Sequence, residues 1–390
     1  MTSILDLKWL YYCPQTPEAA YDGLKATFPE VSCDISSFQK LFYDKWVLLK
    51  SLGLNIIRGE SLHRLLKSCS NLFDFKYKKP NSMHWQTLQL NRLRWIPILQ
   101  ADYVSHELDA SSLDEWDAFI LPPLNRTQVA HELRKKVGDR LILGEIEAFD
   151  YQPIKEKWKE IRDKIQPSVD AVDLIPFENR LFINSEFFNT LFGTDKFVFL
   201  NITNFDVNNV KKFYKERKEK TSHIIAPRQF FNCSDSLHAV KVMRMIHKKG
   251  YNWRGTITGA QSNFPFSRRQ VYPFQLSQYM PWEEYLDLVA SSYLGIFHSK
   301  GLASCAVLGA CTGTPFLGTQ FAEGIVNCFP ELAVKWGNYE EMAKLAIRLI
   351  EEPEWYDEVV RKAEERVDKI YSFEAIRKQL DLILKERDLL

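Results

Sequence analysis

The sequence predicts an α/β protein with two domains, each built on a parallel sheet of the doubly wound type. The chain has 390 residues, which is long for a single hydrophobic core. Short apolar strands alternate with helical segments along most of its length, as in parallel α/β sheets. The alternation is interrupted over residues 201–221, a polar stretch in which no strand is predicted, and this stretch is the expected domain connection. Its lysine-rich part, Lys211 to Lys220, predicts a solvated surface.

Composition is that of an ordinary globular protein, with 45% apolar and 26% charged residues. A net charge of +1 is too balanced to indicate nucleic-acid binding by itself. No apolar run reaches membrane-spanning length, and Asp6 stands where a signal peptide would be basic and then apolar. The seven cysteines form no Cys-x-x-Cys pair and are expected to be reduced core thiols. We therefore expect a cytoplasmic protein with no integral membrane segment.

In the first half, apolar and aromatic runs predict strands, and amphipathic or capped runs predict helices. Pro14 ends the first strand, and Thr16-Pro17-Glu18 supplies the cap, proline and acid of a helix start. The predicted strands are 8–13, 116–121, 140–145, 171–175 and 197–201. The predicted helices are 16–28, 38–52, 61–72, 84–99, 127–137, 154–165 and 178–192.

In the second half, predicted strands and helices alternate again, and the chain ends in predicted helices. Its predicted strands are 223–226, 253–258, 270–274 and 294–297, followed by one that starts at Phe316. Its predicted helices are 236–249 and 281–290, the segment that begins near Leu302, and three in the tail at 339–351, 354–369 and 373–384.

The most informative stretch is Ile296 to Thr319. A strand stops at His298-Ser299-Lys300-Gly301, an apolar helix follows, and Gly313 with Pro315 ends that helix before the next strand. This is a βαβ unit, so its strands are parallel. The turn then lies at the carboxyl edge of the sheet, where free backbone N–H groups of the helix would bind a phosphate. An ordinary crossover turn that binds nothing fits the spacing equally well.

The residues of this stretch resemble a known pattern. Phe297-His298-Ser299, Lys300-Gly301-Leu302-Ala303, Leu308-Gly309 and Gly313-Thr314-Pro315 stand where the large retaining nucleotide-sugar family of GT-B glycosyltransferases, the group 1 type, has Pro-Ser, Glu-Gly-Phe-Gly, Glu-Ala and Gly-Thr-Pro. The resemblance implies two Rossmann-like domains facing a central cleft. It implies an acceptor-side domain of residues 1–203, a donor-binding domain of 204–372, and a last helix, 373–390, that returns to the first domain.

The resemblance also implies donor-binding positions, which are Arg228, Gly259, Ser299, Lys300, Gly301, Leu302, Ala303 and Ser304. Arg228, Lys300 and the amides of 301–304 could carry the charge of a departing diphosphate without a metal. No cofactor is expected beyond the nucleotide sugar itself. An ion pair for Arg228 and a solvent-exposed loop position for Lys300 are the alternative interpretations.

A transferase that inverts the sugar needs a base near the acceptor hydroxyl. Glu145 ends a predicted strand at the carboxyl edge of the first sheet and is the catalytic candidate, ahead of Glu147 and His106. A surface carboxylate is the alternative for each of them.

The chain departs from the family at three positions. Lys300 and Leu308 replace its acidic pair, and Cys233 replaces a lysine. The predicted function is a metal-independent glycosyltransferase that moves a sugar from a nucleotide diphosphate to a glycan, lipid-linked, protein or modified DNA-base acceptor. The first alternative is a glycosyltransferase-like binding protein that has lost turnover. The second is a DNA-base glucosyltransferase of viral type, with a basic rim drawn from Arg92, Arg94, Arg268 and Arg269.

Overall fold

The computed structural model describes residues 3–12, 32–33, 95–100, 103–105, 113–123, 130–145, 155–177, 185–203, 205–227, 234–258, 272–277, 280–298 and 303–390. The chain divides into two compact units. Unit 1 comprises Met1–Pro176, Leu191–Val198 and Ile383–Leu390, and unit 2 comprises Phe177–Thr190 and Phe199–Leu382. The domain limits that the sequence implied remain predictions. So does the cleft between the two domains.

Residues 3–200 contain the first sheet, a separate two-stranded sheet and several helices. The elements are β1 (Trp9–Tyr12), β2 (Ser32–Cys33), α6 (Trp95–Leu99), β3 (Tyr103–Ser105), the 3-10 turn η2 (Leu113–Glu115), β4 (Ala118–Pro123), α7 (Ala130–Val137), β5 (Leu141–Glu145), α8 (Lys155–Ala171), β6 (Ile175–Phe177), α9 (Ser185–Phe192) and β7 (Phe197–Phe199). The two-stranded sheet is made of β6 and β7.

The sheet of unit 1 has the order β2-β3-β1-β4-β5, and all four strand pairs are parallel. Its centre is apolar because Trp9 on β1 and Phe119 on β4 are fully buried. β4 continues through Pro122 and Pro123, whereas the strand predicted from the sequence, 116–121, stops before them. The register shifts between Leu121 and Pro123, so the residue that cannot donate a ladder hydrogen bond lies at an irregularity at the strand end.

The prediction for α8 was wrong at its carboxyl end. The helix passes Pro167 and ends at Ala171, and the next strand starts at Ile175 rather than at 171. Ile165 and Val169 are both buried, so the apolar face continues beyond the predicted end. Arg134 caps this end, because its Nε donates to the Ala171 carbonyl at 2.9 Å.

Residues 201–390 contain the second sheet, its helices and the helical tail. They are α10 (Val207–Lys211), the 3-10 turn η3 (Arg217–Glu219), β8 (Thr221–Pro227), α11 (Ser234–Lys248), β9 (Arg254–Thr258), β10 (Phe274–Leu276), α13 (Trp282–Ser291), β11 (Ser292–Phe297), α14 (Ser304–Thr312), β12 (Phe316–Thr319), α15 (Glu323–Cys328), the 3-10 turn η4 (Pro330–Leu332), β13 (Ala333–Val334), α16 (Tyr339–Glu351), α17 (Pro353–Tyr371) and α18 (Phe373–Glu386).

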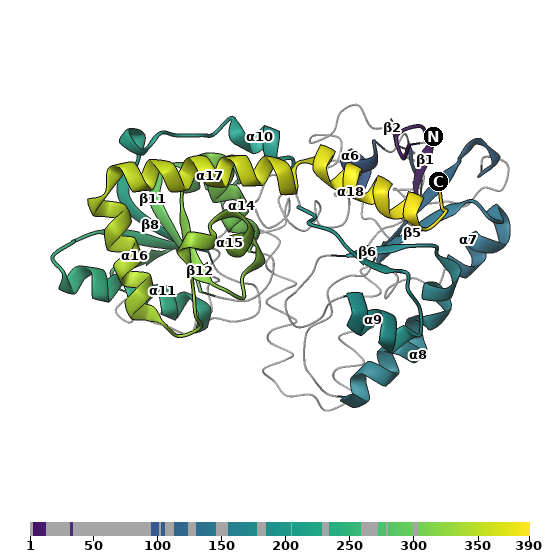
Figure 1. Cartoon of the computed structure of the whole chain (residues 1–390), viewed down its shortest axis with the longest axis horizontal. Helices are drawn as coiled ribbons and strands as arrows, with labels where there is room; N and C mark the ends of the chain where they lie inside the picture. Colours follow the sequence, from purple (N-terminus) through teal and green to yellow (C-terminus); the bar gives the residue numbers. More distant parts are fainter. Residues whose placement is uncertain are drawn as a thin grey trace, which may run out of the picture. The chain divides into compact units, whose positions relative to one another are not determined.

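The sheet of unit 2 has the order β10-β9-β8-β11-β12-β13, and every pair is parallel. Three of its strands, β8, β11 and β12, are labelled in Figure 1. Along the chain, β9 and then β10 follow on one side of β8, whereas β11, β12 and β13 follow on its other side. This is the doubly wound strand order. The order reverses between β8 and β11. α11 packs on β8, β11 and α16, whereas α14 packs on β11, β12 and α13. The predicted parallel α/β architecture is confirmed, and in unit 2 it is of the Rossmann type.

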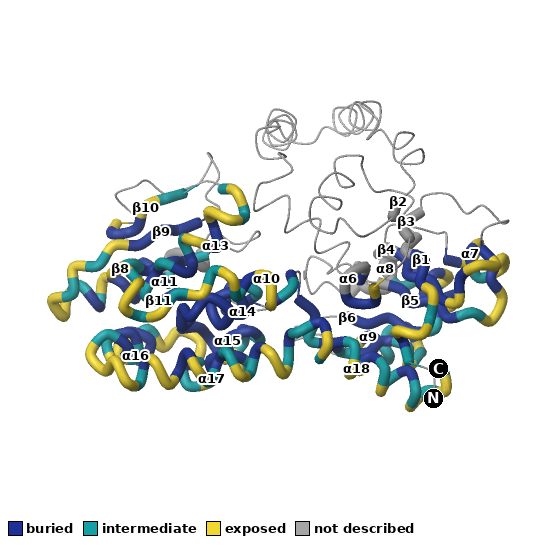
Figure 2. The backbone as a smooth tube through the Cα atoms, turned by 90° about the horizontal axis from the view of Figure 1, so that it is seen from above, coloured by how far each residue is buried: buried dark blue, intermediate teal, exposed yellow. Residues whose placement is uncertain are grey.

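Burial follows this arrangement. The central strands and α14 are buried, while the outer surfaces of α16 and α17 reach solvent (Figure 2). The predicted tail helices at 339–351, 354–369 and 373–384 are confirmed to within two residues at each end. The helices predicted at 16–28, 38–52 and 61–72, and most of 84–99, lie outside the described residues. Within the described ranges, none of the helices is both long and apolar enough to cross a bilayer.

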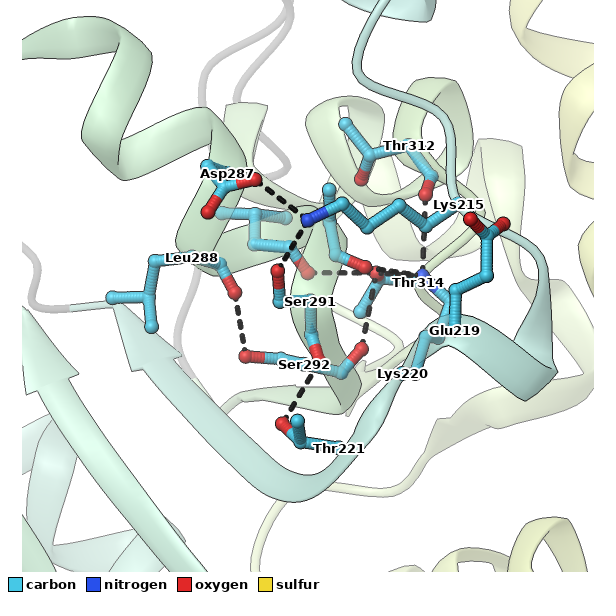
Figure 3. A network of polar contacts seen from close by, with 12 residues as sticks. Lys215, Glu219, Lys220, Thr221, Asp287, Leu288, Ser291, Ser292, Thr312 and Thr314 are labelled. Carbon is cyan, nitrogen blue, oxygen red and sulfur yellow. Dashed lines mark hydrogen bonds and ion pairs between the residues drawn. The ribbon is translucent and has the colours of Figure 1, made fainter.

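The lysine-rich run was predicted to be a solvated surface, and this is wrong for Lys211, Lys215 and Lys220. Lys211 pairs with Asp368 at 2.7 Å, and the other two are drawn in Figure 3. Lys220 Nζ donates to the carbonyls of Ala290 at 2.6 Å and Thr312 at 3.2 Å, and to Thr314 Oγ1 at 2.9 Å. Lys215 Nζ donates to Asp287 at 2.6 Å. Lys215 and Lys220 thus satisfy groups at the carboxyl ends of α13 and α14, where cations are favoured.

Candidate functional site

The carboxyl ends of three neighbouring strands meet at one edge of the sheet of unit 2. β9, β8 and β11 are adjacent and parallel, and they end at Thr258, Pro227 and Phe297. This is the place where open α/β sheets bind ligands, since the strand order reverses between β8 and β11.

Most of the donor-binding positions predicted from the sequence follow directly on these strand ends. Arg228 follows β8, Gly259 follows β9, and 299–302 lie between β11 and α14. These residues lie outside the described part of the chain. Ala303 and Ser304 are described, and they form the start of α14.

The amino end of α14 is open. Ala303 precedes the helix with φ 51° and ψ 50°, in the left-handed region, and no side chain caps the helix within the described residues. The first N–H groups of a helix have no carbonyl partner inside it, and the helix dipole adds positive potential there. In α14 the N–H of Ala306 donates to the Ala303 carbonyl at 2.7 Å, so the amides that concern an anion are those of Ser304 and Cys305. α14 is therefore arranged to receive an anion at this end.

Ala303 is a non-glycine residue in a conformation that glycine adopts more easily. It stands at the last glycine of the family's Glu-Gly-Phe-Gly run. We expect the Ala303→Gly substitution to raise the free energy of unfolding by up to about 1 kcal/mol. Chemical denaturation measures this change, and Ala306→Gly, inside α14, is the control that should destabilise the protein instead. A loss of stability in Ala303→Gly would show that the left-handed conformation is not adopted.

His298 is a residue of this edge whose importance the sequence did not reveal. It follows β11 directly, and only 2% of its surface is exposed. Its Nε2 accepts the N–H of Gly337 at 3.2 Å. Burial, together with the neighbouring His238, lowers the pKa of His298 to about 4, so the ring is neutral at pH 7. Within the described part of the chain, its Nδ1 has no hydrogen-bond partner.

Aromatic rings enclose His298. The ring centroids of His238, Trp336 and Tyr339 lie 4.2, 4.5 and 5.2 Å from that of His298. Tyr339 Oη and His238 Nδ1 are 2.6 Å apart, which fixes these two side chains relative to each other. The rings come from α11, from α16 and from the segment after β13, so the cluster forms only in the folded unit. Nothing in the spacing of these residues along the chain pointed to it.

Leu308, which replaces the second acid of the family pattern, is 4% exposed. Every residue of α14 from Cys305 to Thr312 is buried, so Leu308 is a core residue. A leucine side chain offers no hydrogen bond to a ribose. Any nucleotide bound at this edge must therefore be held by other groups.

Glu145, the catalytic candidate, ends β5 opposite Pro123, at the carboxyl edge of the sheet of unit 1. This agrees with the predicted strand and its end. The position of the Glu145 side chain is not described, and Glu147 and His106 lie outside the described residues. The role of Glu145 as a catalytic base therefore remains a prediction.

Neither metal nor thiol chemistry is indicated in the part of the chain that the structure describes. No group of three or more His, Cys, Asp or Glu side chains is arranged there to hold a metal ion. Cys305, Cys311 and Cys328 are free and buried, and burial raises the pKa of each thiol. These three are the core thiols that the sequence predicted.

Comparison with known proteins identifies the fold. No family model and no curated protein sequence matches the chain. Among solved structures, an alpha-glucosyltransferase in complex with UDP and a 13-mer DNA containing a HMU base superposes with a TM-score of 0.52 at 12% identity, over 77% of this chain and 95% of the other. The chain has the GT-B glycosyltransferase fold.

Two further GT-B structures support this assignment. The pneumococcal O-GlcNAc transferase GtfA, in complex with UDP and GlcNAc, has a TM-score of 0.51 at 12% identity, over 69% of this chain and 56% of the other. A single-residue mutant of S. aureus TarM, in complex with Fondaparinux, alpha-GlcNAc-glycerol and UDP, has a TM-score of 0.50 at 14% identity, over 67% and 54%. The resemblance seen in the sequence is thus confirmed for the GT-B fold.

Proposed function

We propose that this chain is a glycosyltransferase that moves a sugar from a nucleotide-diphosphate donor. The observation that carries the proposal is the open amino end of α14 at the point where the strand order of a GT-B sheet reverses. The GT-B structures that it resembles are complexes with UDP, which supports a nucleotide as the ligand. The acceptor is a separate question.

Transfer from such a donor builds negative charge on the departing diphosphate. Positive groups placed beforehand at that position stabilise the transition state. We assign this work to the first amides of α14, to Lys300 as a point charge and to Arg228 as a bidentate donor. Both side chains follow strand ends that lie side by side in the sheet. In this arrangement, groups of the protein chain supply the positive charge that stabilises the departing diphosphate.

We propose Glu145 as the group that takes the proton of the acceptor hydroxyl. Its place at the carboxyl end of β5 supports this assignment. In Glu145→Gln we expect transfer to fall by at least about 100-fold, within the range for general-base catalysis, with donor affinity unchanged. A variant with full transfer activity would remove Glu145 from the mechanism.

Thermal denaturation tests donor binding directly. A ligand of the native state at 100 times its Kd adds about 2.7 kcal/mol to the free energy of unfolding. We expect one of UDP, GDP, ADP or their sugar conjugates to raise the Tm of the wild-type protein by several degrees. Lys300→Met and Arg228→Met should each reduce the shift, whereas Lys249→Met, an exposed lysine after α11, should not.

Failure of every nucleotide and nucleotide sugar to shift the Tm would overturn the proposed function. Binding without any transfer to a broad acceptor panel would favour the non-catalytic binding protein instead. The panel includes duplex DNA with a HMU base, since the alpha-glucosyltransferase with this fold is seen bound to such DNA. The arginines that would form a basic rim, Arg92, Arg94, Arg268 and Arg269, lie outside the described residues, so only this assay addresses DNA as the acceptor.

A further inference from the structure

We propose that His298 is a donor-binding residue whose Nδ1–H donates a hydrogen bond to a phosphate oxygen of the nucleotide. This inference rests on the proposed function and deepens it by adding a neutral hydrogen-bond donor to the cations already assigned. Three observations support it: the tautomer of His298, the lack of a hydrogen-bond partner for its Nδ1 within the described residues, and the position of His298 at the end of β11.

The tautomer follows from one hydrogen bond. The Gly337 N–H can only donate, so Nε2 of His298 accepts and carries no proton. In a neutral imidazole the proton is then on Nδ1. Nδ1–H is therefore a fixed donor, and it needs an acceptor.

That acceptor is missing within the described part of the chain. His298 is 2% exposed, and Nδ1 is buried without a hydrogen-bond partner. Buried polar groups are nearly always paired, and unpaired ones in folded proteins point to a bound ligand, ion or water. A ligand oxygen would satisfy this N–H, whereas a cation would not.

The place of His298 in the chain favours a phosphate as the acceptor. Nδ1 is bonded to Cγ and so stays close to the backbone at the end of β11, whereas the far nitrogen Nε2 reaches Gly337. The chain passes from this point through 299–302 to the open end of α14. An anion held by the first amides of α14 lies beside the same connection, since only the six residues 298–303 separate the end of β11 from Ser304, and His298 is the first of them.

The surrounding rings keep the donor in place. Trp336, Tyr339 and His238 all pack around the imidazole, and His238 and Tyr339 also stack on each other. With its ring enclosed and Nε2 held by Gly337, His298 keeps Nδ1–H in one orientation. Tyr339 is accordingly a positioning residue, which packs on His298 directly and also holds His238 against it.

Nitrogen-15 NMR of the imidazole tests the tautomer in the wild-type protein. We expect His298 to show the Nδ1–H tautomer at pH 7 and to remain neutral down to about pH 5, since its pKa is lowered to about 4. Addition of a nucleoside diphosphate or of inorganic pyrophosphate should shift the Nδ1 resonance, and the free sugar alone should not. A shift with the sugar but not with pyrophosphate would overturn the assignment to phosphate, as would the Nε2–H tautomer.

Substitutions test the contact itself. His298→Leu removes the donor, and we expect its Kd for the nucleoside diphosphate to rise about 10- to 100-fold, as for a hydrogen bond to a charged group. His298→Asn keeps an N–H near the position of Nδ1 and should stay within about fivefold of the wild type. His247→Leu, a histidine at the other end of α11 whose Nε2 is 2.6 Å from the Trp253 carbonyl, is the matched control and should leave the Kd unchanged.

The outcomes separate the two proposals. If the wild type binds the nucleotide and His298→Leu binds it equally well, the inference about His298 is wrong and the proposed function stands. If the wild type binds no nucleotide, the proposed function fails, whatever tautomer His298 shows. If His298→Leu does not fold, His298→Asn and the wild-type spectra decide.

Discussion

Gly309→Val is expected to lower the free energy of unfolding of unit 2 by more than about 4 kcal/mol, at the severe end for a single substitution. A Cβ at Gly309 would overlap the ring of Phe316 and the backbone carbonyl of Thr314. Phe316 is fully buried and its ring also fills the space in front of Gly295, so it has no room to move away. The carbonyl is part of the backbone that ends α14. The substitution therefore forces the helix away from β12.

Urea denaturation, followed by fluorescence, measures this effect. Gly250→Ala is the control, since Gly250 has φ +97° and nothing lies within 4 Å of an added Cβ. Its cost is limited to backbone strain, about 1 to 3 kcal/mol. Equal losses in the two variants would show that α14 does not approach β12 as closely as the structure has it. Because the open end of α14 depends on this packing, nucleotide binding should also be lost in Gly309→Val.

The second large effect is expected for Lys220→Met. This substitution removes three hydrogen bonds and leaves the carbonyls of Ala290 and Thr312 without their ammonium partner. The Thr312 carbonyl keeps the backbone N–H of Lys215 at 3.3 Å, so the Ala290 carbonyl is the acceptor that loses its partner. A buried acceptor left unsatisfied costs about 1–3 kcal/mol, and this is the loss that we expect. Lys218→Met is the control: this neighbouring lysine is 77% exposed and should contribute little. A loss below about 1 kcal/mol in Lys220→Met, the value of an exposed ion pair, would show that the network in Figure 3 is not a stabilising one.

Lys220 also predicts a dependence on pH. Burial, with repulsion from Lys215, lowers the pKa of Lys220 to about 7 from its ordinary 10.5. Between these values the unfolded chain binds more protons than the native protein, so stability rises with pH. From pH 7 to 8.5 we expect a gain of about 1.5 kcal/mol in the wild type that is absent in Lys220→Met. The range stops at about pH 8.5 because the buried cysteines, whose pKa values are raised, act in the opposite direction from about pH 9.

The βαβ unit around α14 could be predicted from the sequence because local signals agree there. Glycine and proline mark the end of α14, the helix is uniformly apolar, and both strands are short apolar runs. The predicted strand start at Phe316 is confirmed, and β11 ends at Phe297 as expected. The parallel α/β class followed from the same alternation, and the GT-B resemblance followed from motif order.

What the sequence did not predict depends on contacts between distant segments. The tautomer of His298 is fixed by Gly337, 39 residues away. Lys220 looks like one charge in a lysine run, although its partners lie 70 to 94 residues further along the chain. The carboxyl end of α8 was misplaced because the helix continues through Pro167 and buries Val169, beyond the charge-rich part from which it was predicted. In each case tertiary packing overrode the local pattern.

The division of the chain carries a consequence for biosynthesis. Unit 1 contains both the first strand and the final segment Ile383–Leu390, in which Arg387 forms an ion pair with Asp195 at 3.5 Å. A ribosome delivers residues in order, so the sheet of unit 2 can assemble while this last segment is still in the exit tunnel. Completion of unit 1 must then wait until Ile383–Leu390 has left the tunnel.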